Sequence, residues 1–165
     1  MATSSNDPWR ASCGRHVEAT PSRVAVVGVG HALRGDDAAG LVLAQRAAPL
    51  AGDRLLVVEG GPVPENITGL LRRFKPDLVL LVDAADLGAE PGAVRWLTTD
   101  VIEGLSATTH TMPLSMLARY LQHELDCSVC LVGIQPAQND IGQPLSDPVE
   151  KAVIAVSEGL RAVFA

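Results

Sequence analysis

The sequence predicts an α/β fold, a three-layer α/β/α sandwich with a twisted, mostly parallel sheet of about five strands and helices on both faces. Two features of the chain predict it. Short runs that are apolar at nearly every position alternate with longer segments whose apolar residues recur at helical spacing. Runs that are apolar throughout are typical of strands buried on both faces. Their regular alternation with helices is typical of a parallel sheet between two helical layers.

The strands are predicted from runs rich in branched aliphatic residues. Four such runs predict buried strands, at residues 24–29, 54–59, 77–82 and 128–134. A shorter and more mixed segment, residues 93–97, predicts a strand at the edge of the sheet.

The helices are predicted between these runs. The first covers residues 37–48, which are rich in Ala and Leu and end before Pro49. The last is expected to start with Asp147 as N-cap, followed by Pro148 at the first helical position. Apolar residues at i, i+3, i+4 and i+7 mark the helical faces, and they include Ile67, Leu70, Leu71 and Phe74, then Leu114, Leu117, Leu121 and Leu125, then Val149, Val153, Val156 and Leu160.

The composition is that of one globular domain preceded by a tail. We expect residues 1–22 to form a flexible N-terminal tail and residues 23–165 to form a single domain. A net charge of −6 argues against a nucleic-acid partner, and no apolar run is long enough to span a membrane. The absence of an apolar signal segment and the odd count of three cysteines favour a cytoplasmic protein. Cys127 and Cys130 have the spacing of a metal or redox pair, but we expect core cysteines.

Polar residues follow several predicted strands, where the ligand crevice of such a fold lies. Asp36 and Asp37 come after the first strand, Asp83 ends the third, and His110 follows the edge strand. Taken singly, each has an ordinary role, as a helix cap or a hydrogen-bonded loop histidine. One of the two adjacent acids is expected to cap the helix, which leaves the other free. Together the residues predict an open site for a divalent ion such as Ni, Zn, Mn or Fe.

The first of these segments also has features of a dinucleotide-binding loop. Gly28 and Gly30 match the first two glycines of that fingerprint, and Glu59 ends the second strand, where an acid would hold a ribose. The third glycine position, however, is Leu33. Two carboxylates also stand at the helix start, where a pyrophosphate needs bare amide donors. The sequence therefore favours a cation over a nucleotide.

Five segments stand in order along the chain: Gly28-Val29-Gly30 with Gly35 to Gly40, Glu59-Gly60-Gly61 with Pro64-Glu65-Asn66, Val82-Asp83-Ala84, Thr108 to Leu114, and Gly133-Ile134-Gln135-Pro136. Together they resemble the hydrogenase maturation endopeptidases, above all the branch that processes the large subunit of the formate-hydrogenlyase hydrogenase. The resemblance covers residues 23–165. His31 stands where the family usually has Asn, and a loop hydrogen bond is its expected role.

This resemblance implies an endopeptidase that removes a C-terminal peptide from the large-subunit precursor of a nickel–iron hydrogenase. It implies nickel as the metal, delivered by the substrate, with another divalent ion able to substitute. The family's catalytic and metal-binding residues fall on Asp37, Asp83 and His110. The metal could polarise the scissile carbonyl or activate water, or one carboxylate could act as general base. The alternative is a non-catalytic nickel-binding maturation chaperone that uses the same three ligands.

Overall fold

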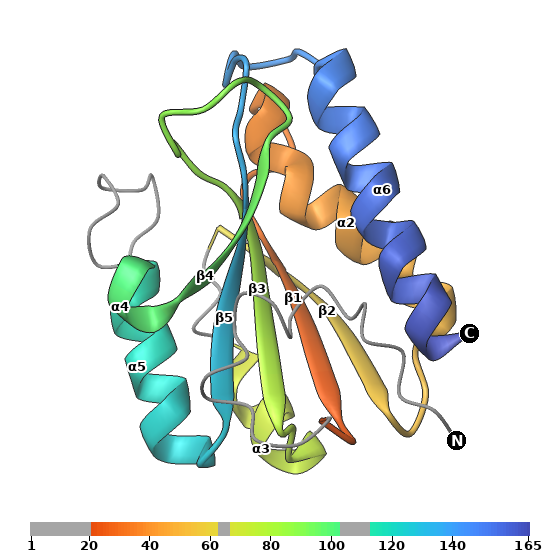
Figure 1. The fold of residues 1–165 in the computed structure, drawn as a ribbon, viewed down its shortest axis with the longest axis vertical. Helices are drawn as coiled ribbons and strands as arrows, with labels where there is room; N and C mark the ends of the chain where they lie inside the picture. The colour runs from red at the N-terminus through yellow and green to blue at the C-terminus, as the bar shows by residue number, and fades with distance from the viewer. Residues whose placement is uncertain (1–20, 63–66, 103–112) are drawn as a thin grey trace.

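The computed structural model describes residues 21–62, 67–102 and 113–165. Within these residues one five-stranded sheet lies between two layers of helices (Figure 1), so the predicted α/β sandwich is confirmed. None of the helices in the described part is both long and apolar enough to cross a bilayer. The strands are β1 (Val24–Val29), β2 (Leu55–Gly61), β3 (Leu78–Ala84), β4 (Val94–Thr98) and β5 (Ser128–Ile134). The helices are α2 (Ala39–Ala47), α3 (Thr68–Phe74), α4 (Thr99–Ile102), α5 (Leu114–Leu125) and α6 (Asp147–Phe164), with the 3-10 turns η1 (Gly35–Ala38) and η2 (Ala48–Leu50).

The strand order creates a switch point between β1 and β3. The order across the sheet is β2-β1-β3-β5-β4, and all neighbours are parallel except β4, which runs antiparallel to β5. From β1 the chain moves outward to β2 and then returns to β3 on the other side of β1. Ligands of open α/β sheets bind beyond the carboxyl ends of the strands at such a point.

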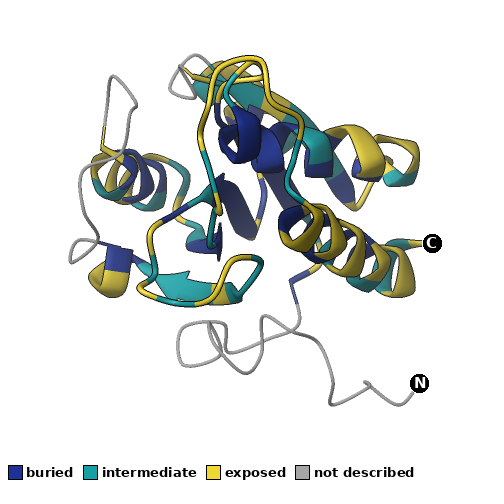
Figure 2. Cartoon of the chain, turned by 90° about the horizontal axis from the view of Figure 1, so that it is seen from above, coloured by how far each residue is buried: buried dark blue, intermediate teal, exposed yellow. Residues whose placement is uncertain are grey.

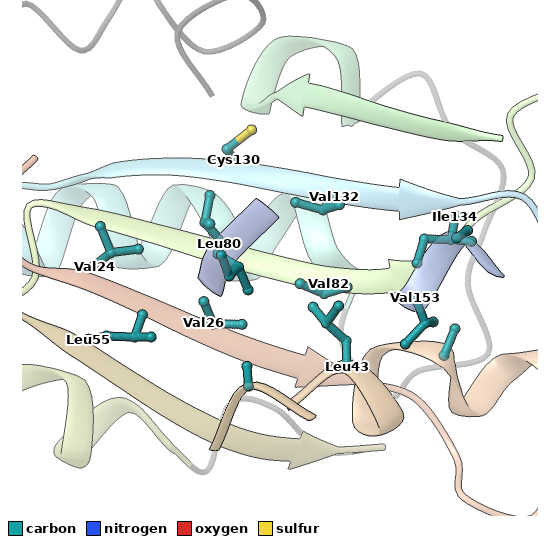
Figure 3. Packing of buried hydrophobic residues seen from close by; sticks show 14 of the residues in the cluster. Val24, Val26, Leu43, Leu55, Leu80, Val82, Cys130, Val132, Ile134 and Val153 are labelled. Carbon is teal, nitrogen blue, oxygen red and sulfur yellow. The ribbon is translucent and has the colours of Figure 1, made fainter. Parts of the chain in front are cut away.

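The core consists of two clusters, one on each face of the sheet. Because side chains alternate along a strand, Val24 and Val26 of β1 pack under α2 and α6, while Ala25 and Val27 pack under the helices of the opposite face. Figure 3 shows the first cluster, in which Leu43 of α2 lies against the sheet. Figure 2 shows the buried sheet between helices that expose their outer faces.

Most element boundaries lie close to those predicted. β1 and β5 match their predicted ranges, and the predicted edge strand is found one residue later, as β4. The single helix predicted over residues 37–48 is instead a 3-10 turn, the helix α2 and part of a second 3-10 turn. Helix α4 was not predicted.

The predicted N-cap of the last helix is wrong by one residue. Ser146 is the N-cap, because its extended backbone precedes Asp147 and its carbonyl accepts the Glu150 N–H at 2.9 Å. Pro148 is therefore the second helical residue, not the first. The Ser146 hydroxyl makes no capping hydrogen bond, and its actual partner, Asp36, is described below.

Cys127 and Cys130 belong to the core and its edge. Cys130 is fully buried, whereas Cys127 is half-buried and carries a free thiol. Burial, and then the nearby negative charge of Asp126, raise the pKa of Cys127 to about 11. A thiol that stays protonated at neutral pH is a poor metal ligand and nucleophile.

Asp77 fastens the start of β1 to the turn before β3. Its Oδ2 accepts hydrogen bonds from Ser22 N at 2.9 Å, Ser22 Oγ at 2.7 Å and Arg23 N at 2.9 Å. The Ser22 hydroxyl bond is the main reason why the pKa of Asp77 lies below its usual value. Ser22, the last residue of the predicted tail, thus contacts the domain. Residues 1–20 lie outside the described part of the chain.

We expect Asp77→Ala to lower the melting temperature by roughly 2–4 °C at pH 7, because about 1 kcal/mol of hydrogen bonding is lost. A carboxylate whose pKa is depressed by folding stabilises the protein above its unfolded pKa, and this stabilisation is lost as pH falls through the folded pKa. The difference between wild type and variant should therefore shrink below about pH 4. Thermal unfolding at several pH values measures it. Asp53→Ala, which removes an exposed charge near β2, is the control, and an equal effect there would contradict the role of Asp77.

Candidate active site

The turn after β1 places Asp37 above the boundary between β1 and β3. The first turn of α2 lies directly on the strand ends, since a Cβ added at Gly40 would clash with the carbonyl oxygens of Val29 and Val82. Only glycine permits this approach. The chain returns from β1 to η1 with a hydrogen bond from His31 N to the Asp37 carbonyl oxygen at 3.2 Å.

Asp83 lies beside the same turn. It is the sixth residue of β3 and is fully buried. A Cβ placed on Gly30 would lie 3.8 Å from Asp83 Oδ1 and would clash with the Asp37 carbonyl oxygen. Gly30, with φ at +137°, therefore lies between the backbone of Asp37 and the carboxylate of Asp83. The structure thus brings two of the predicted site residues to the switch point.

Asp36, the other acid of the pair, anchors the segment that follows β5. Its Oδ2 accepts hydrogen bonds from Ala137 N at 2.8 Å, Gln138 N at 3.1 Å and Ser146 Oγ at 2.8 Å, and its Oδ1 accepts one from Ser146 N at 2.7 Å. The prediction that one acid caps its own helix is wrong, because neither η1 nor α2 has a side-chain cap. Asp36 satisfies donors of another segment, which passes near α2 at the top of Figure 1.

Asp37 retains capacity to bind a ligand. It is 7% exposed, and its buried Oδ2 has no hydrogen-bond partner among the described residues. Burying a carboxylate oxygen without a partner is costly. Such an oxygen is suited to hold a cation or to accept a proton from a reactant. Asp37 is therefore the free acid of the pair.

The other residues singled out from the sequence lie outside the described residues or are exposed to solvent. His110 lies outside the described residues, and within those residues no group of three His, Cys, Asp or Glu side chains could hold a metal. His31 is exposed, and its Nδ1 accepts the Leu33 N–H at 3.2 Å, which is the loop hydrogen bond expected for it. Glu59 is exposed on β2.

Sequence reasoning named Asp36 and Gln135 but missed their positioning roles. Gln135 Oε1 accepts hydrogen bonds from Leu87 N at 2.6 Å and Ala89 N at 3.3 Å, and so holds the loop that follows Asp83. Its place directly after a buried strand was visible in the sequence. Its partners were not, because they lie more than 40 residues away.

Comparisons with known proteins place this chain in a family. The family model described as hydrogenase maturation protease matches residues 43–161. The hydrogenase 3 maturation protease of Escherichia coli K12 is 36% identical over 134 residues, which cover 81% of this chain and 85% of that protein. The chain belongs to the hydrogenase maturation protease family.

Solved structures of hydrogenase maturation proteases agree in fold. A crystal structure of the nickel–iron hydrogenase maturation protease HycI from Thermococcus kodakarensis has a TM-score of 0.83 at 28% identity, and the match covers 93% of this chain and 99% of that one. The solution structure of the endopeptidase HycI from Escherichia coli has a TM-score of 0.74 at 34% identity, covering 82% and 87%. These relatives are proteases, so the hydrogenase maturation protease described here is a peptidase and not a non-catalytic chaperone.

The site of this hydrogenase maturation protease depends on the absence of a side chain at Gly30. We expect Gly30→Ala to reduce peptide cleavage at least 100-fold, because the new Cβ must displace Asp37 or Asp83. Gly88→Ala is the matched control, since Gly88 also has positive φ, +62°, but its Cβ would meet nothing within 4 Å. Gly88→Ala should lose about 1 kcal/mol of stability to backbone strain, and Gly30→Ala should lose more, because its Cβ also meets the Asp37 carbonyl oxygen. Equal cleavage rates for the two variants would contradict this geometry.

Substitution of Asp36 should destabilise the protein much more than substitution of Asp37. Asp36→Ala leaves four partly buried donor contacts without their acceptor, and we expect a loss of roughly 3 kcal/mol in the free energy of unfolding. Asp37→Ala should cost less than about 1 kcal/mol, because Asp37 Oδ2 accepts no hydrogen bond from a described residue. Urea unfolding of the two variants measures the difference, and a larger loss for Asp37→Ala would contradict the assignment.

Proposed function

We propose that the protein removes a C-terminal peptide from the nickel-loaded large-subunit precursor of a nickel–iron hydrogenase, and that Asp37, Asp83 and His110 recognise the nickel in this substrate. The observation that carries the proposal is the buried Asp37 Oδ2, which has no hydrogen-bond partner among the described residues, in a turn whose backbone lies across Gly30 from the buried Asp83 carboxylate. Membership in the hydrogenase maturation protease family supports it.

The chemistry of the three side chains fits nickel. Two carboxylates and one imidazole suit a borderline divalent ion, and three protein ligands leave positions open for groups of the substrate. Asp37 and Asp83 are both buried beyond or at the carboxyl ends of β1 and β3. His110 precedes α5 by four residues. Val79 and Leu81 of β3 pack on the face of the sheet that α5 covers. Because side chains alternate along a strand, Asp83 lies on that same face.

The charges of the site provide a reason for nickel dependence. Two buried carboxylates in one region repel each other, and this repulsion is strong where water is scarce. A precursor that carries a divalent cation would relieve the repulsion, whereas a nickel-free precursor would not. Binding energy would then depend on the metal content of the substrate.

Hydrolysis requires a water molecule and a proton acceptor. The water oxygen bonds to the scissile carbonyl carbon, the carbon–nitrogen bond breaks, and the leaving amine takes up a proton. The Asp37 carboxylate is suited to accept the proton of the attacking water as general base, since its Oδ2 has no partner among the described residues. Nickel held by the same residues would polarise the carbonyl.

The direct test is cleavage of a hydrogenase large-subunit precursor in vitro. Incubation of the nickel-loaded precursor with the protein should lower its mass by that of a C-terminal peptide, as read by mass spectrometry. The nickel-free precursor should stay intact. Cleavage of both forms at equal rates would contradict nickel recognition, and cleavage of neither form of its cognate precursor would contradict the proposed function.

Substitution of the three residues should separate activity from folding. We expect Asp37→Asn, Asp83→Asn and His110→Ala each to reduce processing of the nickel-loaded precursor more than 100-fold, with the melting temperature within about 4 °C of wild type. His123→Ala is the control for His110→Ala, because His123 lies on α5 with a side chain that is 90% exposed. Normal processing by all three variants would refute the assignment.

A further inference from the structure

Two large apolar side chains next to the site are exposed. Leu33, in the turn after β1, is 65% exposed, and Ile141, between β5 and α6, is 78% exposed. They are the two most exposed large hydrophobic residues in the described part of the chain. A single exposed leucine is ordinary in a folded protein. Here two such residues lie on distant segments that meet beside the candidate active site.

A short backbone pairing joins the two segments that carry these residues. Arg34 and Ile141 form an antiparallel bridge, and Gly142 N donates a hydrogen bond to the Leu33 carbonyl oxygen at 2.9 Å. This pairing places Arg34 across from Ile141 and Leu33 across from Gly142, so Leu33 and Ile141 lie on adjoining segments although they are 108 positions apart in the chain. We refer to this pair as the apolar rim.

The apolar rim stands on fixed backbone. Asp36 N donates to the Gln138 carbonyl oxygen at 3.0 Å, and the Asp36 carboxylate binds the same segment from the other direction. The Gln138 side chain holds the turn around Ile141, donating to Pro144 O at 3.0 Å and accepting from Asp140 N at 2.9 Å. A surface ordered in advance loses little entropy when a partner binds.

The apolar rim is continuous with the candidate active site. Asp37 N donates a hydrogen bond at 3.0 Å to the carbonyl oxygen of Arg34, which is both the neighbour of Leu33 and the bridge partner of Ile141. Any peptide bond presented to the Asp37 carboxylate must have neighbouring residues that pass close to this turn. The partner that reaches the rim is therefore the substrate itself.

We propose that the apolar rim is a docking surface for apolar side chains of the hydrogenase large-subunit precursor, close to the peptide bond that is cut. This inference rests on the proposed function. It assigns Leu33 and Ile141 to substrate binding, with no part in bond breaking. Loss of the two side chains should weaken binding of the precursor and leave the chemical step unchanged.

The test uses the full-length protein with Leu33→Ser and Ile141→Ser combined, and nickel-loaded precursor as substrate. We expect KM to rise about tenfold, while kcat stays within about twofold of wild type. The conservative double variant Leu33→Met with Ile141→Leu should restore KM. Ile154→Ser, which removes an exposed apolar side chain from α6, should leave KM unchanged.

The outcomes separate this inference from the proposed function. If the wild-type protein cuts the precursor and the serine double variant has an unchanged KM, the docking surface is wrong and the proposed function stands. If the wild type cuts no precursor, the proposed function itself fails. A second copy of the chain is the other possible occupant. Light scattering that shows a wild-type dimer and a monomeric double variant would overturn the assignment to substrate.

Discussion

The site depends on the close contact between the first turn of α2 and the ends of β1 and β3. Gly28 and Gly40 face each other there, and a Cβ on either would clash with backbone carbonyl oxygens. Because the two elements approach so closely, the preceding turn η1 lies over the carboxyl ends of β1 and β3, and its two acids are forced into buried positions. A side chain at this contact would lift η1 away and separate Asp37 from Asp83. The position of the candidate site is thus a consequence of backbone packing.

Two neighbouring acids in this turn have different partners. Asp36 lies among four donor contacts from the segment between β5 and α6, whereas Asp37 keeps a buried oxygen with no such contact in the described residues. Stability and function are therefore assigned to adjacent residues of identical chemistry. From the sequence, both acids were recognisable as unusual at a helix start, and Asp83 as a carboxylate after a buried strand. The family resemblance pointed to Asp37 as the free acid, but local patterns alone could not predict it, because the donors that engage Asp36 lie about 100 residues away.

Much of the fold followed from local patterns. The apolar runs of β1 and β5 identified strands buried on both faces, and the spacing of Leu114, Leu117 and Leu121 identified α5, because burial imposes these patterns directly on the sequence. Long-range contacts account for what local patterns could not predict. Ser146 caps α6 through its backbone while its hydroxyl binds Asp36, and the antiparallel direction of β4 is set by pairing with β5. The apolar rim was equally hidden, since only the Arg34–Ile141 bridge reveals it.

The central claim is that Asp37, Asp83 and His110 converge on one cation. A crystal structure of the protein grown with nickel, read through the anomalous signal of that metal, tests it most directly. The account predicts one strong anomalous peak beyond the carboxyl ends of β1 and β3, within bonding distance of both carboxylates and the His110 imidazole. A peak elsewhere, or His110 turned away from the two acids with no density between them, would contradict the account.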